Sequence, residues 1–328
     1  MRLSIIMPVF NAGKTLERTL LSLAGQLTSL VELVVVDDGS TDSTPDILSR
    51  FAGESGEAFH IFRQDNAGAA SARNTALNYA KGEYLAFVDA DDSLCAGAIS
   101  TILRETESGA DIIGWDWQNE NSGKIRRFYQ PAYSSPSEAL KNLMGGTMKW
   151  NLWLYAVKRS LVLENGIRFL DGADMGEDMA FMLKCFSKAG TVKQIHEVLY
   201  EYNASNPASI SQQLNERRRD EVSGNLDSAE KFLMETDHAE LCRQFLPHLK
   251  LFIKLPLLIG QSKENYRLWY GWFSEANAFA CKNNALPLRT RALQWLASQK
   301  MWNGVKFYNV LYNAAIRMKY NTQSGVSE

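Results

Sequence analysis

Short apolar runs alternate with segments of helical periodicity through the first 116 residues. The runs are rich in Val, Ile, Leu and Phe, which is typical of strands buried on both faces of a sheet. We predict strands at residues 3–9, 31–36, 60–63, 84–88 and 111–115. The segments between them predict helices at about 13–24, 43–51, 69–81 and 96–107. Such alternation indicates an α/β fold with a mostly parallel sheet covered by helices.

The pattern changes twice farther along the chain. Residues 117–136 are polar and irregular, apart from a short apolar run at 125–129, so we predict an insertion there. A mixed pattern then resumes, with a helix from near 137, strands near 153–157 and 198–202, and a helix at about 177–189. Beyond residue 212 only helical spacing remains. We therefore predict an α/β domain at residues 1–211, with halves 1–116 and 117–211, and a helical extension at 212–328.

Composition excludes several classes of protein. The 328 residues are 45% hydrophobic and 22% charged, values that are typical of globular domains and not of collagen-like or disordered chains. The four cysteines are far apart without a C-x-x-C pair, which argues against a cysteine zinc cluster and a disulfide scaffold. The four histidines show no metal-ligand spacing. We expect no secretory leader, no membrane-spanning helix and a cytoplasmic location.

Charge is distributed unevenly along the chain. The net charge is −2 overall, but it is −11 for residues 1–240 and +9 for residues 241–328. An acidic front region argues against nucleic acid as the main partner. The basic region from residue 241 also holds 14 of the 35 aromatic residues.

This basic aromatic tail has two interpretations. We predict one helix face shared by Trp295, Trp302, Val305, Tyr308 or Tyr312, and Ala315, with flanking positive charges at Lys300, Lys306, Arg317 and Lys319. Such a helix would suit peripheral contact with an anionic membrane, at its inner face for a cytoplasmic protein. Alternatively, the tail is a helical cap that packs on the preceding domain.

Two predicted strands end in carboxylates. The run 34–36 leads directly into Asp37, Asp38 and Gly39, at the carboxyl end of a predicted parallel strand. Ligands of open α/β sheets bind at such ends, where a carboxylate can accept hydrogen bonds from a base or a ribose. The alternative is a polar turn capped by Ser40 or Asp42.

The second acidic strand end is Asp89-Ala90-Asp91-Asp92, which follows the apolar run 84–88. Three carboxylates within four residues repel each other, and a divalent cation relieves that repulsion. Their hard oxygen atoms suit Mg²⁺ or Mn²⁺, and the remaining coordination positions would be free for diphosphate oxygens. The pattern indicates a metal and diphosphate site.

The order of five motifs resembles that of family 2 glycosyltransferases with the GT-A fold. The motifs are Pro8-Val9-Phe10-Asn11, Val36-Asp37-Asp38-Gly39-Ser40-Thr41-Asp42, Asn66-Ala67-Gly68 with Ala72-Arg73-Asn74, Asp89-Ala90-Asp91-Asp92, and Gly176-Glu177-Asp178. They extend over roughly 210 residues at spacings similar to those of the family. The resemblance implies a GT-A, Rossmann-like, mostly parallel sheet flanked by helices, plus a C-terminal all-α extension.

The resemblance implies roles for the motif residues at the donor end. Pro8 and Phe10 match positions that line the nucleotide base and ribose. Asp38 matches the acid that accepts from the base edge, with Asp37 as its neighbour. Arg73 matches the arginine that reaches the nucleotide pocket.

The remaining motif residues concern the metal and the acceptor. Asp91 matches the principal ligand of Mn²⁺ or Mg²⁺. Asp89 matches the first acid of the same motif and is a second candidate metal ligand, while Ala90 between them belongs with the nucleotide-binding residues. Asp178 matches the general base, and Glu177 is the alternative one residue away. Without the resemblance, these two acids equally suit a helix start.

The implied reaction is transfer of a sugar from a nucleotide sugar, with uridine as the expected base, to a hydroxyl of a glycan or lipid-linked acceptor. The configuration at the sugar carbon should invert, because the base and the leaving diphosphate act from opposite faces.

The sequence departs from the usual family pattern at two places. Asn203 occupies a position at which Arg or His is common in the family, with Ser209 and Ser211 as neutral substitutes. Tryptophan pairs at 115/117 and 150/153 could stack on a sugar ring or pack in the core.

Two other functions are alternatives to glycosyl transfer. A nucleotidyltransferase would need a glycine-rich, basic loop after its first strand, whereas Asn11-Ala12-Gly13-Lys14 offers one glycine and one lysine. A non-catalytic nucleotide-sugar-binding or scaffold protein would not need to keep the acids used only for turnover. The joint presence of Asp89, Asp91 and Asp178 argues against that class.

Overall fold

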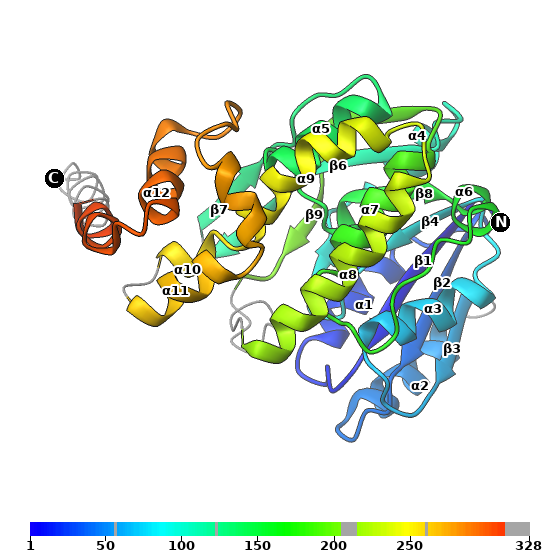
Figure 1. Ribbon diagram of the computed structural model, residues 1–328. Coiled ribbons are helices and arrows are strands. Elements are labelled where there is room, and N and C mark those ends of the chain that lie inside the picture. Colours follow the sequence, from blue (N-terminus) through cyan, green and yellow to red (C-terminus); the bar gives the residue numbers. More distant parts are fainter. Residues whose placement is uncertain (56–57, 122–123, 205–214, 260–261, 312–328) are drawn as a thin grey trace, which may run out of the picture. The chain divides into compact units, whose positions relative to one another are not determined.

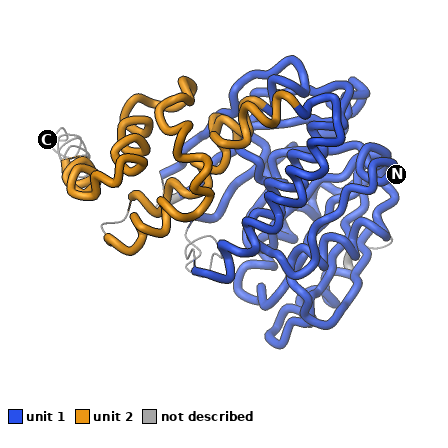
Figure 2. The backbone as a smooth tube through the Cα atoms, in the orientation of Figure 1, with its two compact units in different colours: residues 1–140, 149–239 blue, residues 141–148, 240–328 orange. Residues whose placement is uncertain are grey.

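The computed structural model describes residues 1–55, 58–121, 124–204, 215–259 and 262–311. The chain divides into two compact units (Figure 2). Unit 1 comprises residues 1–140 and 149–239, and unit 2 comprises residues 141–148 and 240–328.

One mixed β-sheet forms the centre of unit 1 (Figure 1). Its described strands are β1 (Leu3–Val9), β2 (Val31–Asp37), β3 (Phe59–Arg63), β4 (Tyr84–Phe87), β5 (Ser93–Leu94), β6 (Ile112–Asn121), β7 (Lys124–Phe128), β8 (Tyr155–Lys158) and β9 (Val192–Tyr202). Their order is β3-β2-β1-β4-β8-β6-β9-β5, and β7 pairs with β6. Strands β1 to β4 pair in parallel, as do β6 and β9, whereas β8 runs antiparallel to both β4 and β6.

The first strands are buried along nearly their whole length. All residues of β2 are buried, and β1 is buried except at Pro8. Leu3 pairs with Val31, and the register continues to Val9 beside Asp37. A strand covered on both faces has no polar alternation, which is why these segments appear in the sequence as continuous apolar runs.

Helices cover this sheet and form the remainder of both units. The labelled α-helices are α1 (Leu16–Ala24), α2 (Thr44–Ser55), α3 (Ala69–Tyr79), α4 (Ala98–Thr106), α5 (Pro136–Gly145), α6 (Arg159–Glu164), α7 (Glu177–Lys188), α8 (Glu216–Met234), α9 (Ala239–Ile253), α10 (Pro256–Ile259), α11 (Lys263–Gly271) and α12 (Leu288–Ser298), and residues 302–311 are also helical. Helix α1 buries Leu16, Leu20 and Leu23. That spacing places the three side chains on one face, toward the sheet.

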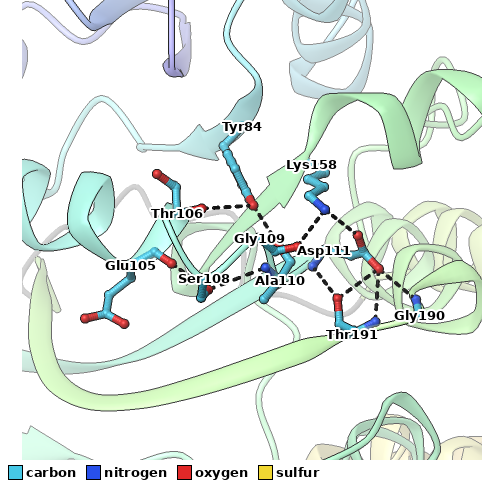
Figure 3. Close-up of polar contacts among 10 residues, drawn as sticks. All are labelled: Tyr84, Glu105, Thr106, Ser108, Gly109, Ala110, Asp111, Lys158, Gly190 and Thr191. Atoms are coloured by element: carbon cyan, nitrogen blue, oxygen red, sulfur yellow. Dashed lines mark hydrogen bonds and ion pairs between the residues drawn. The ribbon is translucent and has the colours of Figure 1, made fainter.

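The amino ends of β4, β6 and β9 are joined by a polar cluster around Asp111 (Figure 3). Asp111 Oδ2 accepts hydrogen bonds from the backbone N–H groups of Gly190, at 2.8 Å, and Thr191, at 3.0 Å. Its Oδ1 atom lies 2.9 Å from Lys158 Nζ. Tyr84 donates its hydroxyl to the carbonyl of Ala110 at 2.9 Å. These contacts tie together loops that the sheet itself leaves unpaired.

Two predicted segments differ from the structure. The region predicted as an irregular insertion is a β-hairpin, in which Trp117 of β6 pairs with Phe128 of β7. Its exposed polar residues conceal the strand pattern, because only one face of the hairpin carries aromatic side chains. The prediction of a single helix face in the tail is also wrong: α12 ends at Ser298, Lys300 has a φ of +57°, and a new helix begins at 302. Tyr312, Ala315, Arg317 and Lys319 lie outside the described residues.

Helix α8 lies within unit 1, although the sequence places residues 212–328 together. Asn225 is buried in α8 and donates to the carbonyls of Ala173, at 2.9 Å, and Met175, at 3.0 Å. Helical periodicity shows that a segment is helical, but it does not show which body the helix packs against. The extent of the α/β domain, residues 1–211, stays a prediction.

Unit 2 is helical, as predicted, and has its own core around Trp269 and Leu249. Lys254 is completely buried within it and donates from Nζ to the carbonyl of Trp272 at 2.8 Å and to Asn277 Oδ1 at 2.7 Å. Across the described part of the chain, no helix has the length and apolar character needed to cross a bilayer.

Candidate active site

The carboxyl ends of β1 and β2 meet through their turns. Asn11 has a φ of +49° and accepts on Oδ1 from the N–H of Thr41 at 2.9 Å. The N–H of Asn11 donates to Ser40 Oγ at 2.9 Å. Beside this junction, Pro8 is half-buried and the side chain of Phe10 is 51% exposed. An exposed aromatic ring at a strand end offers a flat surface to a ligand.

Asp37 and Asp38 are both buried and have different partners. Asp37 accepts from the N–H of Ser40 at 2.9 Å and from Arg63 Nη1 at 2.6 Å. Asp38 accepts on Oδ1 from the N–H of Ala67 at 2.9 Å and on Oδ2 from the N–H of Gly68 at 2.8 Å. Asp38 therefore anchors the loop before α3, while its Oδ2 retains capacity for a further hydrogen bond.

Helix α1 holds the backbone of the Asp89–Asp92 segment. Thr19 Oγ1 donates to the carbonyl of Asp92 at 2.7 Å, and Arg18 Nη2 donates to the carbonyl of Asp91 at 2.6 Å. Thr15 Oγ1 donates to the carbonyl of Ala90 at 3.1 Å. Because these contacts are to the main chain, they fix the turn without occupying the carboxylates.

Asp89 and Asp92 of this segment have raised pKa values. Burial, together with the charges of Asp178 and Asp91, raises the pKa of Asp89 to about 6, although Arg73 opposes the shift. Burial and the charges of Asp89 and Asp91 raise the pKa of Asp92 to about 8. Burial disfavours the ionised form of an acid, and neighbouring negative charges add to that effect.

Asp92 is the inward-facing member of the segment. Its Oδ2 accepts from the Tyr200 hydroxyl at 2.7 Å, and its Oδ1 accepts from the N–H of Asn203 at 2.7 Å. The backbone N–H of Asp89 donates to the same Tyr200 hydroxyl at 3.1 Å. Asp92 therefore joins the motif to the end of β9, and Asn203 contributes its main chain there. Ser209 and Ser211 lie outside the described residues.

Arg73 of α3 connects the Asp89–Asp92 segment, which follows β4, to the start of α7. Its Nη1 lies 2.8 Å from Glu177 Oε1 and 3.5 Å from Asp178 Oδ1, and its Nη2 lies 3.3 Å from Asp89 Oδ1. Burial alone would lower the pKa of this guanidinium, but the charges of Asp178, Glu177 and Asp89 raise it instead. One buried cation thus serves three acids from two distant segments, so the site retains excess negative charge.

Glu177 and Asp178 begin α7 in different environments. Burial and the charge of Asp178 raise the pKa of Glu177 to about 8, against the opposing effect of Arg73. Asp178 Oδ2 accepts from the N–H of Leu152 at 3.3 Å. Its Oδ1 is buried, and although the Arg73 guanidinium lies 3.5 Å away, this oxygen accepts no hydrogen bond from the residues that the structure describes. A buried carboxylate oxygen without a hydrogen bond is costly unless a ligand supplies one.

The segment before α7 is fastened to α3. Asn74, next to Arg73, accepts from the N–H of Phe169 and donates to its carbonyl, both at 3.0 Å. Asp174 Oδ1 accepts from the N–H of Ala70 at 2.8 Å at the start of α3. Gly68 has a φ of +94°, and a Cβ there would lie 2.1 Å from Asp174 Oδ2. Close approach of the two segments therefore requires glycine at this position.

The donor set fits a divalent cation that also binds a diphosphate. No group of three or more His, Cys, Asp or Glu residues forms a ready metal cage within the described ranges. Mg²⁺ and its analogues in nucleotide sites need only one or two carboxylates, because phosphate oxygens and water complete the coordination. Asp91 and Asp89 offer such carboxylates, and a cation would relieve the repulsion that contributes to the raised pKa of Asp89.

The structure brings Arg73 and Asp89, which are 16 residues apart in the sequence, together with the distant Asp178. The assigned roles of Pro8, Phe10, Asp37, Asp38, Arg73, Asp89, Ala90, Asp91 and Asp178 stay predictions. Sequence reasoning gave no role to Asn74, Asp174 or Tyr200. Asn74 lies inside a quoted motif and Tyr200 lies in the predicted strand 198–202, so both positions were usable signals. Asp174 carries none that a single sequence reveals.

Comparison with known proteins identifies the family. Residues 4–172 match the family described as Glycosyl transferase family 2. The uncharacterized glycosyltransferase EpsJ of Bacillus subtilis is 31% identical over 219 residues, which are 64% of this chain and 62% of that protein. The chain thus matches somewhat less than two thirds of the length of this relative.

Solved structures show the same fold. The crystal structure of S. aureus TarS 1-349 in complex with UDP-GlcNAc has a TM-score of 0.74 at 19% identity, covering 96% of this chain and 92% of that chain. The mannosyltransferase PcManGT from Pyrobaculum calidifontis, in complex with GDP-Man and Mn²⁺, has a TM-score of 0.53 at 18% identity, with coverage of 94% and 85%. These likenesses confirm the predicted α/β, GT-A fold with C-terminal helices. Because the family match covers more than half of the sequence, the chain belongs to glycosyl transferase family 2.

Proposed function

We propose that the chain is an inverting glycosyltransferase that moves a sugar from a nucleoside-diphosphate donor, a UDP-sugar, to a hydroxyl of a glycan or lipid-linked acceptor. The observation that carries the proposal is the Arg73 contact set, which joins Asp89 of the donor motif to Asp178 at the start of α7. Membership of glycosyl transferase family 2 supports the reaction class.

Asp178 is the proposed general base. Its buried Oδ1, which has no hydrogen-bond partner among the described residues, is a fitting receiver for the proton of an acceptor hydroxyl. As the proton moves to Asp178, the acceptor oxygen bonds to the anomeric carbon, and the bond from that carbon to the diphosphate oxygen breaks. Attack and departure on opposite faces invert the configuration. General base catalysis of this kind contributes typically about 10²–10⁴-fold in rate.

Donor binding is proposed at the carboxyl ends of β1, β2 and β4. Pro8, Phe10 and Asp38 would contact the base and ribose. Asp91 and Asp89 would hold Mn²⁺ or Mg²⁺, which when bound supplies positive charge to the departing diphosphate. The structures similar in fold were solved with UDP-GlcNAc, and with GDP-Man and Mn²⁺, which supports a nucleotide-sugar donor and a divalent cation.

The acceptor is proposed to be reached at the cytoplasmic face of an anionic membrane. Nucleotide sugars are made in the cytoplasm, whereas lipid-linked acceptors lie at the bilayer. Residues 241–328 carry a net charge of +9. Unit 2 exposes the large apolar side chains of Trp295, Met301, Phe307 and Leu311, which favours peripheral contact with such a surface.

Three measurements test the proposed function. Ligands that bind the native state raise its apparent stability, so UDP and UDP-sugars with Mn²⁺ are expected to raise Tm more than the same nucleotides without metal. The released product is then identified by mass, and the anomeric configuration of the new linkage is determined by NMR. Release of nucleoside diphosphate with inversion supports the proposal.

Other results would favour the rival functions. Release of pyrophosphate would indicate a nucleotidyltransferase. Donor binding without transfer to any member of a broad acceptor panel would favour a nucleotide-sugar-binding or scaffold protein. Absence of any shift with nucleotides would contradict all three interpretations.

A further inference from the structure

One face of the β7-β6-β9 region is aromatic and lies within unit 1. Trp117 of β6 pairs with Phe128 of β7 on one side and with Tyr200 of β9 on the other. Asn119 pairs with Arg126 and Tyr202 in the same way. Because side chains alternate along a strand, these residues share one face together with Lys124. We call it the aromatic face; its members are Trp117, Asn119, Lys124, Arg126, Phe128, Tyr200 and Tyr202.

The rings of the aromatic face are in mutual contact. Trp117 stacks on Phe128 with centroids 4.0 Å apart and meets Tyr202 edge-on at 6.1 Å. Trp153, from the turn before β8, stacks on Tyr200 at 4.5 Å and meets Trp117 at 5.4 Å. Trp153 and Tyr200 are buried, whereas Trp117, Phe128 and Tyr202 are partly exposed. The outer rings therefore present a supported flat surface.

This surface is continuous with the catalytic groups at two points. The Tyr200 hydroxyl donates to Asp92 and accepts from the N–H of Asp89. On the other side, Leu152, the residue before Trp153, donates its N–H to Asp178. A molecule bound on the outer rings would thus lie on Tyr200 and Trp153. Tyr200 contacts the Asp89–Asp92 segment, and the residue before Trp153 contacts the proposed base, Asp178.

Charges differ between the two faces of these strands. The charged side chains of the aromatic face are Lys124 and Arg126, both exposed, and the Arg126 guanidinium lies 5.0 Å from the Phe128 centroid. The acids of the same paired segments, Glu120 and Glu201, belong to the opposite face, which also carries Arg127. In the described part of this pairing, the aromatic face therefore carries positive charge without a neighbouring acid.

These features match a particular kind of acceptor. Aromatic rings stack on the apolar face of a sugar, while guanidinium and ammonium groups bind carboxylate and phosphate oxygens through charge-assisted hydrogen bonds. We propose that the aromatic face is the acceptor-binding surface and that the acceptor is a glycan with an anionic group, a phosphate or a carboxylate, held by Arg126 and Lys124. The assignment as acceptor rests on the glycosyltransferase function proposed above.

Arg126 and Arg127 provide a matched pair of variants. Both are exposed, adjacent in β7 and on opposite faces of the strand. The full chain, saturated with UDP and Mn²⁺, is applied to an array of defined neutral, phosphate-bearing and uronate-bearing glycans. The wild type is expected to prefer anionic glycans. Arg126→Glu should weaken that binding about tenfold or more, and Arg127→Glu should leave it within about twofold. The phosphate and uronate arms distinguish the source of the anion.

Three results would overturn the inference: equal binding of neutral and anionic glycans, binding of no glycan at all, or equal losses in the two variants. Thermal shifts with UDP and Mn²⁺ are measured for all three proteins. If none responds to UDP, the proposed glycosyltransferase function itself fails. If all respond equally and the glycan pattern is absent, the donor site stands and only the acceptor surface is wrong.

Discussion

The two ends of the central sheet handle buried acids in opposite ways. At the amino ends of the strands, Asp111 has backbone N–H donors from Gly190 and Thr191 and an ion pair with Lys158. Burial alone would raise the pKa of Asp111, but the contacts with Lys158, Thr191 and Gly190 lower it. At the carboxyl ends, burial and like charges raise the pKa of Asp89 and Glu177.

The opposite pKa shifts result from the number of hydrogen-bond donors and cations around each acid, and not from burial itself. Three donor groups and a lysine serve one carboxylate at Asp111 (Figure 3). At the other end, Arg73 is shared by Asp89, Glu177 and Asp178. A buried acid with enough hydrogen-bond donors and a cation of its own stabilises the fold. Buried acids that outnumber their cations are typical of a ligand-binding or catalytic site. The following variants test that distinction.

The largest effect is expected for Asp178→Asn. The amide keeps the shape of the side chain but cannot take up the acceptor proton, so transfer should fall about 10²–10⁴-fold. Donor affinity should change little, because the variant removes a group that acts in the transition state. Rates of UDP release with acceptor and equilibrium binding of UDP with Mn²⁺ measure the two properties. Equal losses in both, in a folded protein, would contradict the assignment of Asp178 as base.

Asp91→Asn should mainly weaken metal-dependent donor binding. Loss of one charged metal ligand is expected to raise the Kd for UDP with Mn²⁺ by about 10–100-fold. Titration with Mn²⁺ at fixed UDP measures the change. Asp111→Asn is the matched control at the opposite end of the sheet, and its UDP affinity should equal that of the wild type. If both variants bind UDP normally, the metal is held elsewhere.

The sequence predicted the acids at 37–38 and 89–92 because each group follows a buried apolar strand, a signal local to one segment. Glu177 and Asp178 begin a helix, and only the family resemblance pointed to them. The parallel strands at 3–9 and 31–36 were foreseen for the same reason. By contrast, the hairpin of β6 and β7 escaped prediction because its polar face breaks the apolar run. The three-way sharing of Arg73 could not be predicted, since it depends on contacts between segments about 100 residues apart.

A smaller effect is expected for Asn74→Ala. Asn74 fixes the backbone of Phe169 through two hydrogen bonds, and this segment leads to Asp178, the proposed base. Slight displacement of Asp178 should lower kcat about tenfold, because misplacement of about 1 Å can cost about 10²-fold. The KM for the donor should stay unchanged. The control is Asn78→Ala. Asn78 lies one turn farther along α3 and accepts a hydrogen bond from Arg168, and its replacement should leave kcat unchanged. If Asn74→Ala also raises donor KM in proportion, Asn74 acts on the whole fold and not on the base.

The smallest effects on activity, and the sharpest test of the comparison, concern the pH dependence of stability. Asp111 has a native pKa below its usual value of 3.8. Its ionised form therefore contributes stability that is present above that value and is lost as pH falls through the native pKa. Asp111→Asn should lower the free energy of unfolding by about 1–3 kcal/mol at pH 7. The deficit relative to the wild type should shrink below pH 4.

Glu177 should show the opposite sign. Its native pKa of about 8 exceeds the usual 4.5, so its protonated form contributes stability that is present below pH 4.5 and is lost as pH rises through about 8. Glu177→Gln stays neutral and should gain stability relative to the wild type between pH 5 and pH 8. Urea unfolding at pH 3, 4, 5, 6, 7 and 8 covers the range in which each variant is expected to differ from the wild type. The measured quantity is the free energy of unfolding of each variant relative to the wild type as a function of pH. If it changes with pH in the same direction for both variants, the acids at the two ends of the sheet are stabilised alike, because only a difference in their partners gives slopes of opposite sign.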